Sequence, residues 1–199
     1  NKLPADDLKQ LKAKAFKAYE AAVERANPFK AVQSCIRKYG LPELKSGGET
    51  LVIGVGKAAP AMINGLRPHI NGTNTCICIT HQENKENVDD CEMFKTGHPV
   101  PNEAGALASK QVITALKQTD KNDQVLFLVS GGGSALMPAP VDGVTLEDKI
   151  ALNEILLSNG LNIDEMNHIR QQVSKLKGGG LLHYACLLYT SDAADDTPC

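Results

Sequence analysis

The sequence of 199 residues lacks three features that would place it in particular classes of protein. None of its six cysteines forms a CxxC pair, no run reaches the roughly 18 apolar residues that a membrane span needs, and neither charge is in excess. The cysteine pattern favours free thiols in a reducing compartment over a disulfide framework or a zinc site. A formal net charge of −2 gives no electrostatic reason to expect nucleic acid or an acidic membrane surface as a partner.

Hydrophobic residues make up 42% of the chain, which is enough for one globular domain with a buried core. The first residues contain no signal-peptide core, but the chain begins at Asn1, so we expect the true start to lie upstream. We therefore expect a cytoplasmic protein, with a mitochondrial location as the alternative.

Two helices are predicted at the N-terminal end. Apolar residues recur at three- and four-residue steps from Asp6 to Ala26, which is typical of an amphipathic helix. Asn27 and Pro28 then fit the N-cap and the first position of a second helix, which would run to about residue 39 and end at Gly40.

Short apolar runs alternate with helical patterns along the middle of the chain. The runs cover residues 50–54, 75–80 and 124–130, and helical spacing covers residues 57–66 and 103–116. This alternation predicts an α/β fold, in which βαβ units build a Rossmann-like parallel sheet of buried strands with helices on both faces. Two more helices are predicted over residues 145–158 and 163–177.

A first glycine loop, with the sequence GVGKAA from Gly54 to Ala59, follows the first predicted strand. Glycine lets the backbone approach a ligand closely, and the following helix would offer free amides to an anion such as phosphate. The loop is not a Walker loop, because the four-residue spacer and the hydroxyl residue after Lys57 are absent. It does satisfy the dinucleotide pattern GxGxxA, with Glu83 near the end of the next strand as a ribose partner. Alternatively, Gly54 and Gly56 only permit tight packing of the strand against the helix.

A second glycine loop directly follows the most apolar strand and consists of Ser130, Gly131, Gly132, Gly133 and Ser134. Consecutive glycines lose much conformational freedom on folding, and they are tolerated where a positive φ or a nearby ligand requires them. In open α/β sheets, ligands bind at the carboxyl ends of the strands. We therefore expect the two glycine loops to meet at one edge of the sheet and hold a polyphosphate. A flexible turn is the alternative for the second loop.

Two further segments carry candidate substrate-binding residues. His98 lies in a proline-stiffened loop before Asn102, the predicted N-cap of the next helix, although a surface histidine would look the same. The spacing of the polar residues in the last predicted helix places them on one face, which could hold an anionic substrate or could simply be solvated. These residues are Asn167, Arg170, Ser174 and Lys177.

Taken together and in this order, four segments resemble the glycerate 2-kinase family over roughly residues 5 to 182. They are a GxGKAA turn, an HPxPxExG segment, an SGGGSAL loop and an ExNx[IV]RxxxSxxKGG helix end. In this chain they cover Gly54 to Ala59, His98 to Gly105, Ser130 to Leu136 and Glu165 to Gly179.

The resemblance implies ATP-dependent phosphorylation of the 2-hydroxyl of D-glycerate to 2-phosphoglycerate, with Mg²⁺, by a Rossmann-like first domain and a smaller second one. It also implies that Lys57 acts in the active site and that the SGGGSAL loop helps to form the cleft. Lys57 is accordingly the catalytic candidate, the two glycine loops are the phosphate-binding candidates, and substrate binding falls to His98, Asn167, Arg170 and Lys177. The metal ligands and the general base are not identified.

The chain departs from the family pattern towards its end. Gly180 stands where many members have arginine, and the family's aspartate in an S-D-V context and its second-domain arginine are missing. Cys186 to Asp195 resembles a translated sequencing adapter, so we expect residues 1–185 to be a truncated, incomplete N-terminal domain and residues 186–199 a non-native tail. Asp192 imitates the family aspartate from within that tail and receives no role. We expect this fragment alone to be inactive.

Two rival functions remain open from the sequence. One is an NAD(P)H-dependent hydroxypyruvate reductase, which the GxGxxA pattern, Glu83 and a reductase label on family relatives suggest. The other is a non-catalytic anion-binding or oligomerisation module. The expected partner is a small molecule, D-glycerate, rather than nucleic acid or membrane, and a homo-oligomer is one option.

Overall fold

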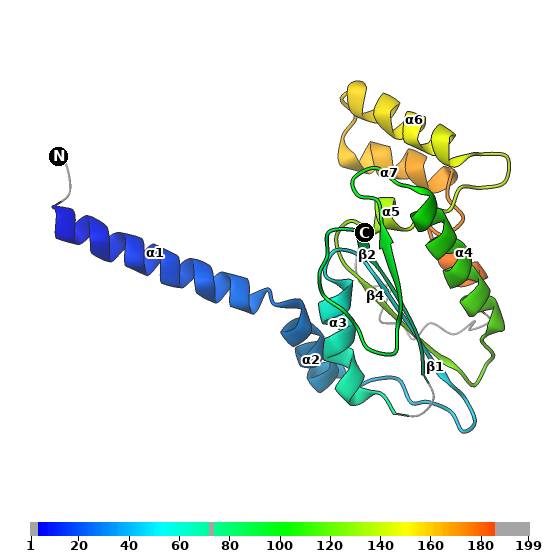
Figure 1. Ribbon diagram of the computed structural model, residues 1–199, viewed down its shortest axis with the longest axis horizontal. Coiled ribbons are helices and arrows are strands. Elements are labelled where there is room, and N and C mark those ends of the chain that lie inside the picture. The colour runs from blue at the N-terminus through cyan, green and yellow to red at the C-terminus, as the bar shows by residue number, and fades with distance from the viewer. Residues whose placement is uncertain (1–3, 72–73, 186–199) are drawn as a thin grey trace.

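The computed structural model describes residues 4–71 and 74–185. The predicted helical pair is confirmed as α1 (Ala5–Arg25) and α2 (Pro28–Tyr39). The side chain of Asn27 accepts a hydrogen bond from the amide of Lys30 at 3.2 Å and so begins α2, which Gly40 ends. α1 projects from the body of the molecule, whereas α2 packs against the helix that follows the first strand (Figure 1).

A four-stranded parallel sheet forms the centre of the molecule, as the alternation of elements predicts. Its strands are β1 (Thr50–Val55), β2 (Asn74–His81), β3 (Glu92–Thr96) and β4 (Gln124–Val129). Their spatial order is β3-β2-β1-β4, and Val55 of β1 pairs with Ile79 of β2 and with Val129 of β4. The carboxyl ends of β1 and β4 are therefore neighbours at one edge of the sheet. β3 is a strand that the sequence patterns did not predict.

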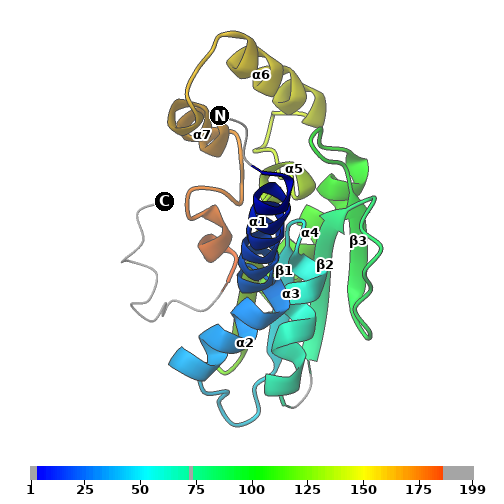
Figure 2. The ribbon, with the colours of Figure 1, turned by 90° about the vertical axis from the view of Figure 1, so that its left-hand side faces the viewer.

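Helices cover both faces of the sheet (Figures 1 and 2). On one face, α3 (Ala59–Leu66) packs with α2 over a core that contains Val52, Ile63 and Cys78. On the other face, α4 (Glu103–Gln118) packs over a core that contains Ile53 and Leu116. All six residues of β1 are buried, because the strand lies between these two layers.

The strand β4 differs from the expectation of a fully buried strand. Its first five residues are half-buried, and Val129 is 60% exposed. β4 lies at the end of the strand order, so within the described residues it has a neighbour on one side only.

Within the described residues, three α-helices follow β4: α5 (Gly133–Leu136), α6 (Leu146–Ser158) and α7 (Ile163–Gln172). α6 and α7 lie side by side beyond the end of the sheet at which α5 lies (Figures 1 and 2). Short 3₁₀ turns cover Arg67–His69 and Gly180–His183.

The prediction that the last helix extends to Lys177 is wrong. α7 ends at Gln172, because the chain then leaves the helix to pair with the segment after α5. Ser174 forms a bridge with Pro140, and the amide of Lys175 donates to the carbonyl of Ala139 at 2.8 Å. The predicted tail, residues 186–199, lies outside the described residues. No helix in the described ranges has the length and apolar character of a membrane span.

Candidate active site at the carboxyl edge of the sheet

The two glycine loops are joined by backbone hydrogen bonds, as expected from their places after β1 and β4. The amide of Ser130 donates to the carbonyl of Val55, and the amide of Lys57 donates to the carbonyl of Gly131, both at 2.9 Å. The hydroxyl of Ser130 accepts from the amide of Ala58 at 3.0 Å. The predicted meeting of the two loops at one edge of the sheet is therefore confirmed.

The first glycine loop is packed so tightly that its amides are already used. Gly56 has a φ of +123°, and an added Cβ would lie 2.1 Å from the hydroxyl oxygen of Ser130. Its amide donates to the carbonyl of Ile79 at 3.0 Å, so the amides of residues 56, 57 and 58 all have partners within the protein. A Cβ on Gly54 would lie 2.6 Å from the side chain of Ile63, which makes that glycine a packing position for α3. Phosphate contacts at Gly54 and Gly56 stay predictions.

In the second glycine loop, by contrast, the backbone amides after Ser130 are unpaired: those of residues 131–134 donate no hydrogen bond to any described residue of the chain. Gly132 has a φ of +97°, which turns the backbone there in a way that a side chain would oppose. The end of the segment is anchored, because the hydroxyl of Thr96 donates to the carbonyl of Leu136 at 2.9 Å. The loop thus offers successive free N–H groups, an arrangement that binds anions.

Lys57 and His98 flank Gly132. A Cβ added to Gly132 would lie 3.1 Å from the ring of His98 and 3.4 Å from the side chain of Lys57. Burial, with the charges of Lys57 and His81 adding to it, lowers the pKa of His98, so its ring favours the neutral form. Lys57 itself is exposed. Both predicted residues therefore lie beside the second glycine loop.

Asn102 fixes the loop that carries His98. Its side-chain oxygen accepts hydrogen bonds from the amide of Gly97 at 3.0 Å and from the amide of Gly105 at 3.1 Å. The predicted N-cap is thus confirmed, and the same oxygen also closes the loop in which His98 lies.

Asn84 is a positioning residue that the sequence patterns missed. Its side-chain amide donates to the carbonyl of Lys57 at 3.0 Å and to the hydroxyl of Thr80 at 3.1 Å. The first glycine loop is therefore held from β2 as well as from β4. A single asparagine in a turn carries no sequence signal of such a role. Glu83, next to it, is exposed, and its predicted ribose contact stays a prediction.

Three basic side chains, Lys149, Arg170 and Lys177, form a cation cluster next to the second glycine loop. The ammonium group of Lys177 donates to the hydroxyl of Ser134. Burial, together with the charges of Lys149 and Arg170, lowers the pKa of Lys177 to about 8. Burial and the charge of Arg170 also lower the pKa of Lys149, which is only 8% exposed. No member of the cluster has an acidic partner among the described residues, so an anion would be favoured there.

The predicted polar face is only partly formed. Asn167 and Arg170 lie on α7, but Ser174 and Lys177 follow its end, so the four residues do not share one helical face. Arg170 donates to the side chain of Asn153 on α6, and Asn167 is exposed. A substrate contact of Asn167 stays a prediction. Lys149 was missed, because a lysine in a helix ordinarily indicates a solvated surface.

Comparisons with known proteins identify the family. The family model described as "Domain of unknown function (DUF4147)" matches residues 14–198. A D-glycerate 2-kinase of Thermotoga maritima is 33% identical over 175 residues, which cover 87% of this chain and 40% of that protein. A protein of Agrobacterium vitis, whose name proposes a hydroxypyruvate reductase, is 34% identical over 188 residues, or 90% of this chain and 41% of its own length.

The fold is likewise that of a solved relative. The crystal structure of a glycerate kinase from Thermotoga maritima matches with a TM-score of 0.77 and 32% identity, over 86% of this chain and 41% of that one. The chain thus spans about two fifths of the length of these relatives. By sequence motifs, family model and fold together, the chain belongs to the DUF4147 family, and its resemblance to the glycerate 2-kinases is confirmed.

Proposed function

We propose that a protein of the relatives' full length containing this chain transfers the γ-phosphoryl group of ATP to the 2-hydroxyl of D-glycerate, giving 2-phosphoglycerate. The observation that carries the proposal is the row of unpaired amides at residues 131–134 beside Lys57 and Lys177. The relative from Thermotoga maritima named as a D-glycerate 2-kinase supports the choice of substrate.

The second glycine loop provides what phosphoryl transfer chiefly needs, which is positioning and neutralisation of charge. Free amides can hold phosphate oxygens without moving, because the loop is already bonded to β1 and to the first glycine loop. Lys57 is exposed next to Gly132, so its ammonium group can reach negative charge on the transferred phosphoryl group. Because the amides of residues 56–58 bond within the protein, the first glycine loop positions Lys57 and does not itself bind phosphate through these amides.

The cation cluster is the place for the carboxylate of the substrate. Lys177 touches the second glycine loop through Ser134, and Arg170 lies near it, so a bound acid would be next to the phosphate groups. Arginine binds carboxylates with a planar fork, and a carboxylate would supply the negative charge that the cluster lacks. The ring of His98, which favours its neutral form, can exchange hydrogen bonds with a hydroxyl of the substrate.

At this edge of the sheet, Mg²⁺ would be held mainly by the phosphate groups of the bound nucleotide. The described ranges contain no group of three or more His, Cys, Asp or Glu side chains placed for a metal ion. Mg²⁺ commonly keeps several water ligands and binds through substrate phosphates, so phosphate oxygens held by the loop would supply much of its coordination. The ion would add positive charge at the transferred group.

A reductase is the weaker candidate, although a relative carries such a name. In a dinucleotide fingerprint, the amides after the first glycines face the pyrophosphate. Here the amides of Gly56, Lys57 and Ala58 bond to the protein instead, and the free amides belong to the second loop. A non-catalytic module would bind the same anions without turnover.

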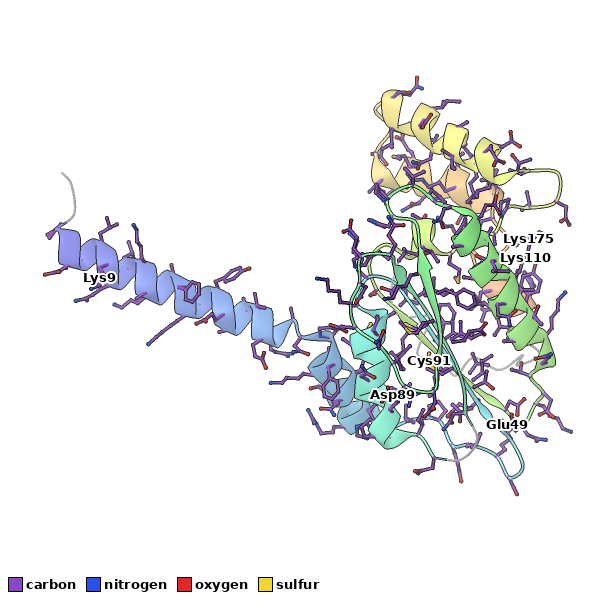
Figure 3. The ribbon with its side chains drawn as sticks, in the orientation of Figure 1. Lys9, Glu49, Asp89, Cys91, Lys110 and Lys175 are labelled. Atoms are coloured by element: carbon purple, nitrogen blue, oxygen red, sulfur yellow. The ribbon has the colours of Figure 1, made fainter. Side chains whose placement is uncertain are left out.

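The proposal is tested by replacing Lys57 in the full-length protein and measuring ADP formation with D-glycerate. Lys57→Met should lower kcat/KM about a hundredfold or more, since it removes a charge next to the transferred group. Lys110→Met is the matched control, because Lys110 is an exposed lysine on α4 (Figure 3). Residues 1–199 alone should bind ATP but form no ADP.

Three results would contradict the proposal. Equal ADP formation by the Lys57 and Lys110 variants would remove Lys57 from the chemistry. Oxidation of NADH with hydroxypyruvate, without ADP formation, would favour the reductase. Binding of ATP and D-glycerate by the full-length protein with no turnover would favour the non-catalytic module.

A further inference from the structure

Two cysteines lie against each other away from the candidate active site. Cys76 lies in β2, and Cys91 directly precedes β3. Because Ile77 pairs with Glu92, the same register one position earlier places Cys76 opposite Cys91. Their sulfur atoms are 2.6 Å apart. Neighbouring strands lie about 4.8 Å apart, within the range of Cα separations that a disulfide bridges.

The cysteine pair is remote from the two glycine loops. Cys76 lies five residues before the carboxyl end of β2 at His81, which corresponds to about 16 Å along the strand. Figure 3 shows Cys91 and Asp89 towards the end of the sheet that is away from α6 and α7. Oxidation of the pair would therefore be a separate property from anion binding at the glycine loops.

A cavity borders the buried Cys76. It has a volume of about 290 Å³, and Cys76 and Arg67 are among its lining residues. Arg67 donates to the carbonyl of Asp89 and lies 3.9 Å from the carboxylate of Asp90. The side chain of Asp90 is 97% exposed, so water screens this pair and it neutralises Arg67 only weakly. Asp90 also lines the cavity, so both charges border it, and the charge of Arg67 is the one that acts on the thiol of Cys76.

The two thiols are chemically unequal. The hydrogen bond between the two sulfur atoms, with help from the charge of Arg67, lowers the pKa of Cys76 against the effect of burial. The same hydrogen bond raises the pKa of Cys91. Burial raises the pKa of the nearby Cys78 to about 12, so that thiol stays protonated. Cys76 also lines the cavity, so it is the thiol that an oxidant in the cavity meets, and we assign it as the nucleophile.

We propose that Cys76 and Cys91 form a reversible disulfide when a small hydroperoxide enters the cavity beside Arg67. The thiolate of Cys76 attacks one peroxide oxygen, so an S–O bond forms, the O–O bond breaks and the departing oxygen takes a proton. The sulfur of Cys91 then attacks the sulfenic acid of Cys76. An S–S bond forms, the S–O bond breaks, and water leaves with the proton of Cys91. Two thiols are oxidised and one peroxide is reduced to two hydroxyl products.

The disulfide would close a loop over residues 76–91. This loop contains Asn84, whose side chain holds the carbonyl of Lys57. The cross-link would therefore restrain the segment that positions the first glycine loop, although the inference does not depend on the proposed function.

The test is a peptide map of the folded chain after treatment with hydrogen peroxide, alkylation and trypsin. Cleavage at lysine, with Arg67 protected by Pro68, places Cys76 in peptide 58–85 and Cys91 in peptide 86–95. We expect these two peptides to be linked, with a mass about 2 Da below the sum of the two reduced peptides plus the one alkyl group that Cys78 carries. Dithiothreitol should separate them. The map distinguishes this link from one that involves any other cysteine.

Variants identify the reacting pair within the linked peptides, since peptide 58–85 also contains Cys78. Cys76→Ser and Cys91→Ser should lose the link, whereas the matched control Cys78→Ser should keep it. Arg67→Gln should slow the reaction several-fold. The proposal is overturned if peptides 58–85 and 86–95 of the unmodified chain stay unlinked while the same peroxide oxidises the exposed Cys35. It is equally overturned if Cys78→Ser, rather than Cys76→Ser, abolishes the link.

Discussion

At the scale of single residues, two glycines at the same edge of the sheet differ in whether they have room for a side chain. A Cβ at Gly56 would lie 2.1 Å from the hydroxyl oxygen and 2.5 Å from the carbonyl oxygen of Ser130, at a φ of +123°. A Cβ at Gly131 would meet nothing within 4 Å. The loops are thus pressed together at Gly56 and open at Gly131.

Gly56→Ala should therefore push the two glycine loops apart and lower the free energy of unfolding by about 2 to 4 kcal/mol. Gly131→Ala should change that free energy by less than about 0.5 kcal/mol, because its methyl group would enter open space. Urea unfolding of both variants measures the difference. Equal stability of the two variants would show that the loops are not in contact as described.

We predict that Lys177 makes the binding of an acid depend on pH. Its pKa is lowered to about 8 from an ordinary value of 10.5, so the folded chain releases this proton before the unfolded chain does. Below about pH 8, Lys177 is protonated in both the folded and the unfolded chain, so burying its charge lowers the free energy of unfolding. As pH rises from about 8 to 10.5, the unfolded state binds more protons, and this group's contribution to stability improves.

A bound carboxylate favours the charged form of Lys177, so affinity for D-glycerate should fall as pH rises through about 8. We expect binding about fivefold weaker at pH 9 than at pH 7, measured by calorimetry on the full-length protein. Lys177→Met should abolish this pH dependence, and Lys110→Met should keep it. An unchanged pH profile in Lys177→Met would assign the effect to another group.

At the scale of elements, Asn102 connects a helix to the candidate site. Asn102→Ala should lower the free energy of unfolding by about 1 to 2 kcal/mol, because it removes the cap of α4 and the bond to Gly97. Asn162→Ala, which removes the cap of α7, is the matched control. Only the first variant should move the NMR signals of the ring of His98. If both variants or neither moved them, Asn102 would not position His98.

The bounds of the N-terminal helices could be predicted because their signals are local. Asn27, Pro28 and Gly40 act through backbone groups a few residues away, and the helix they bound runs from Pro28 to Tyr39. The first three apolar runs became β1, β2 and β4 within a residue or two of their predicted bounds.

The elements that were missed depend on distant partners. β3 contains Glu92 and Lys95 and no long apolar run, and it is a strand because β2 offers it hydrogen bonds at the edge of the sheet. The helical spacing continues past Gln172, but the contacts of Ser174 and Lys175 with the segment after α5 end α7 there. No pattern within either segment reports these partners.

In the candidate site, too, some features could be predicted from the sequence and others depend on contacts between distant residues. The meeting of the glycine loops follows from the rule that parallel strands end at a common edge, and His98 and Lys57 were predicted from motifs. Asn84 and Lys149 could not be predicted, because their roles come from contacts with Lys57 and with the carbonyl of Val173.

At the scale of the whole molecule, the described residues leave apolar surface uncovered. α1 projects from the body, with Phe16 61% and Tyr19 65% exposed, and β4 ends in the exposed Val129 (Figure 1). The site itself is formed by the segments that follow β1, β2, β3 and β4, together with α6, α7 and the region after α7, so it depends on the packing of the whole sheet rather than on one motif.

The proposed function requires that the unpaired amides of residues 131–134 bind phosphate at the edge of the sheet where Lys57 and His98 lie beside them. The most direct measurement is a titration of ¹⁵N-labelled residues 1–199 with ATP and Mg²⁺, followed by two-dimensional NMR of the backbone amides. We predict that the amides of residues 131–134 shift most and that those around Cys76 stay unchanged. If ATP did not bind, or if the amide signals of residues 131–134 kept their chemical shifts while others changed, this loop would not hold the phosphates.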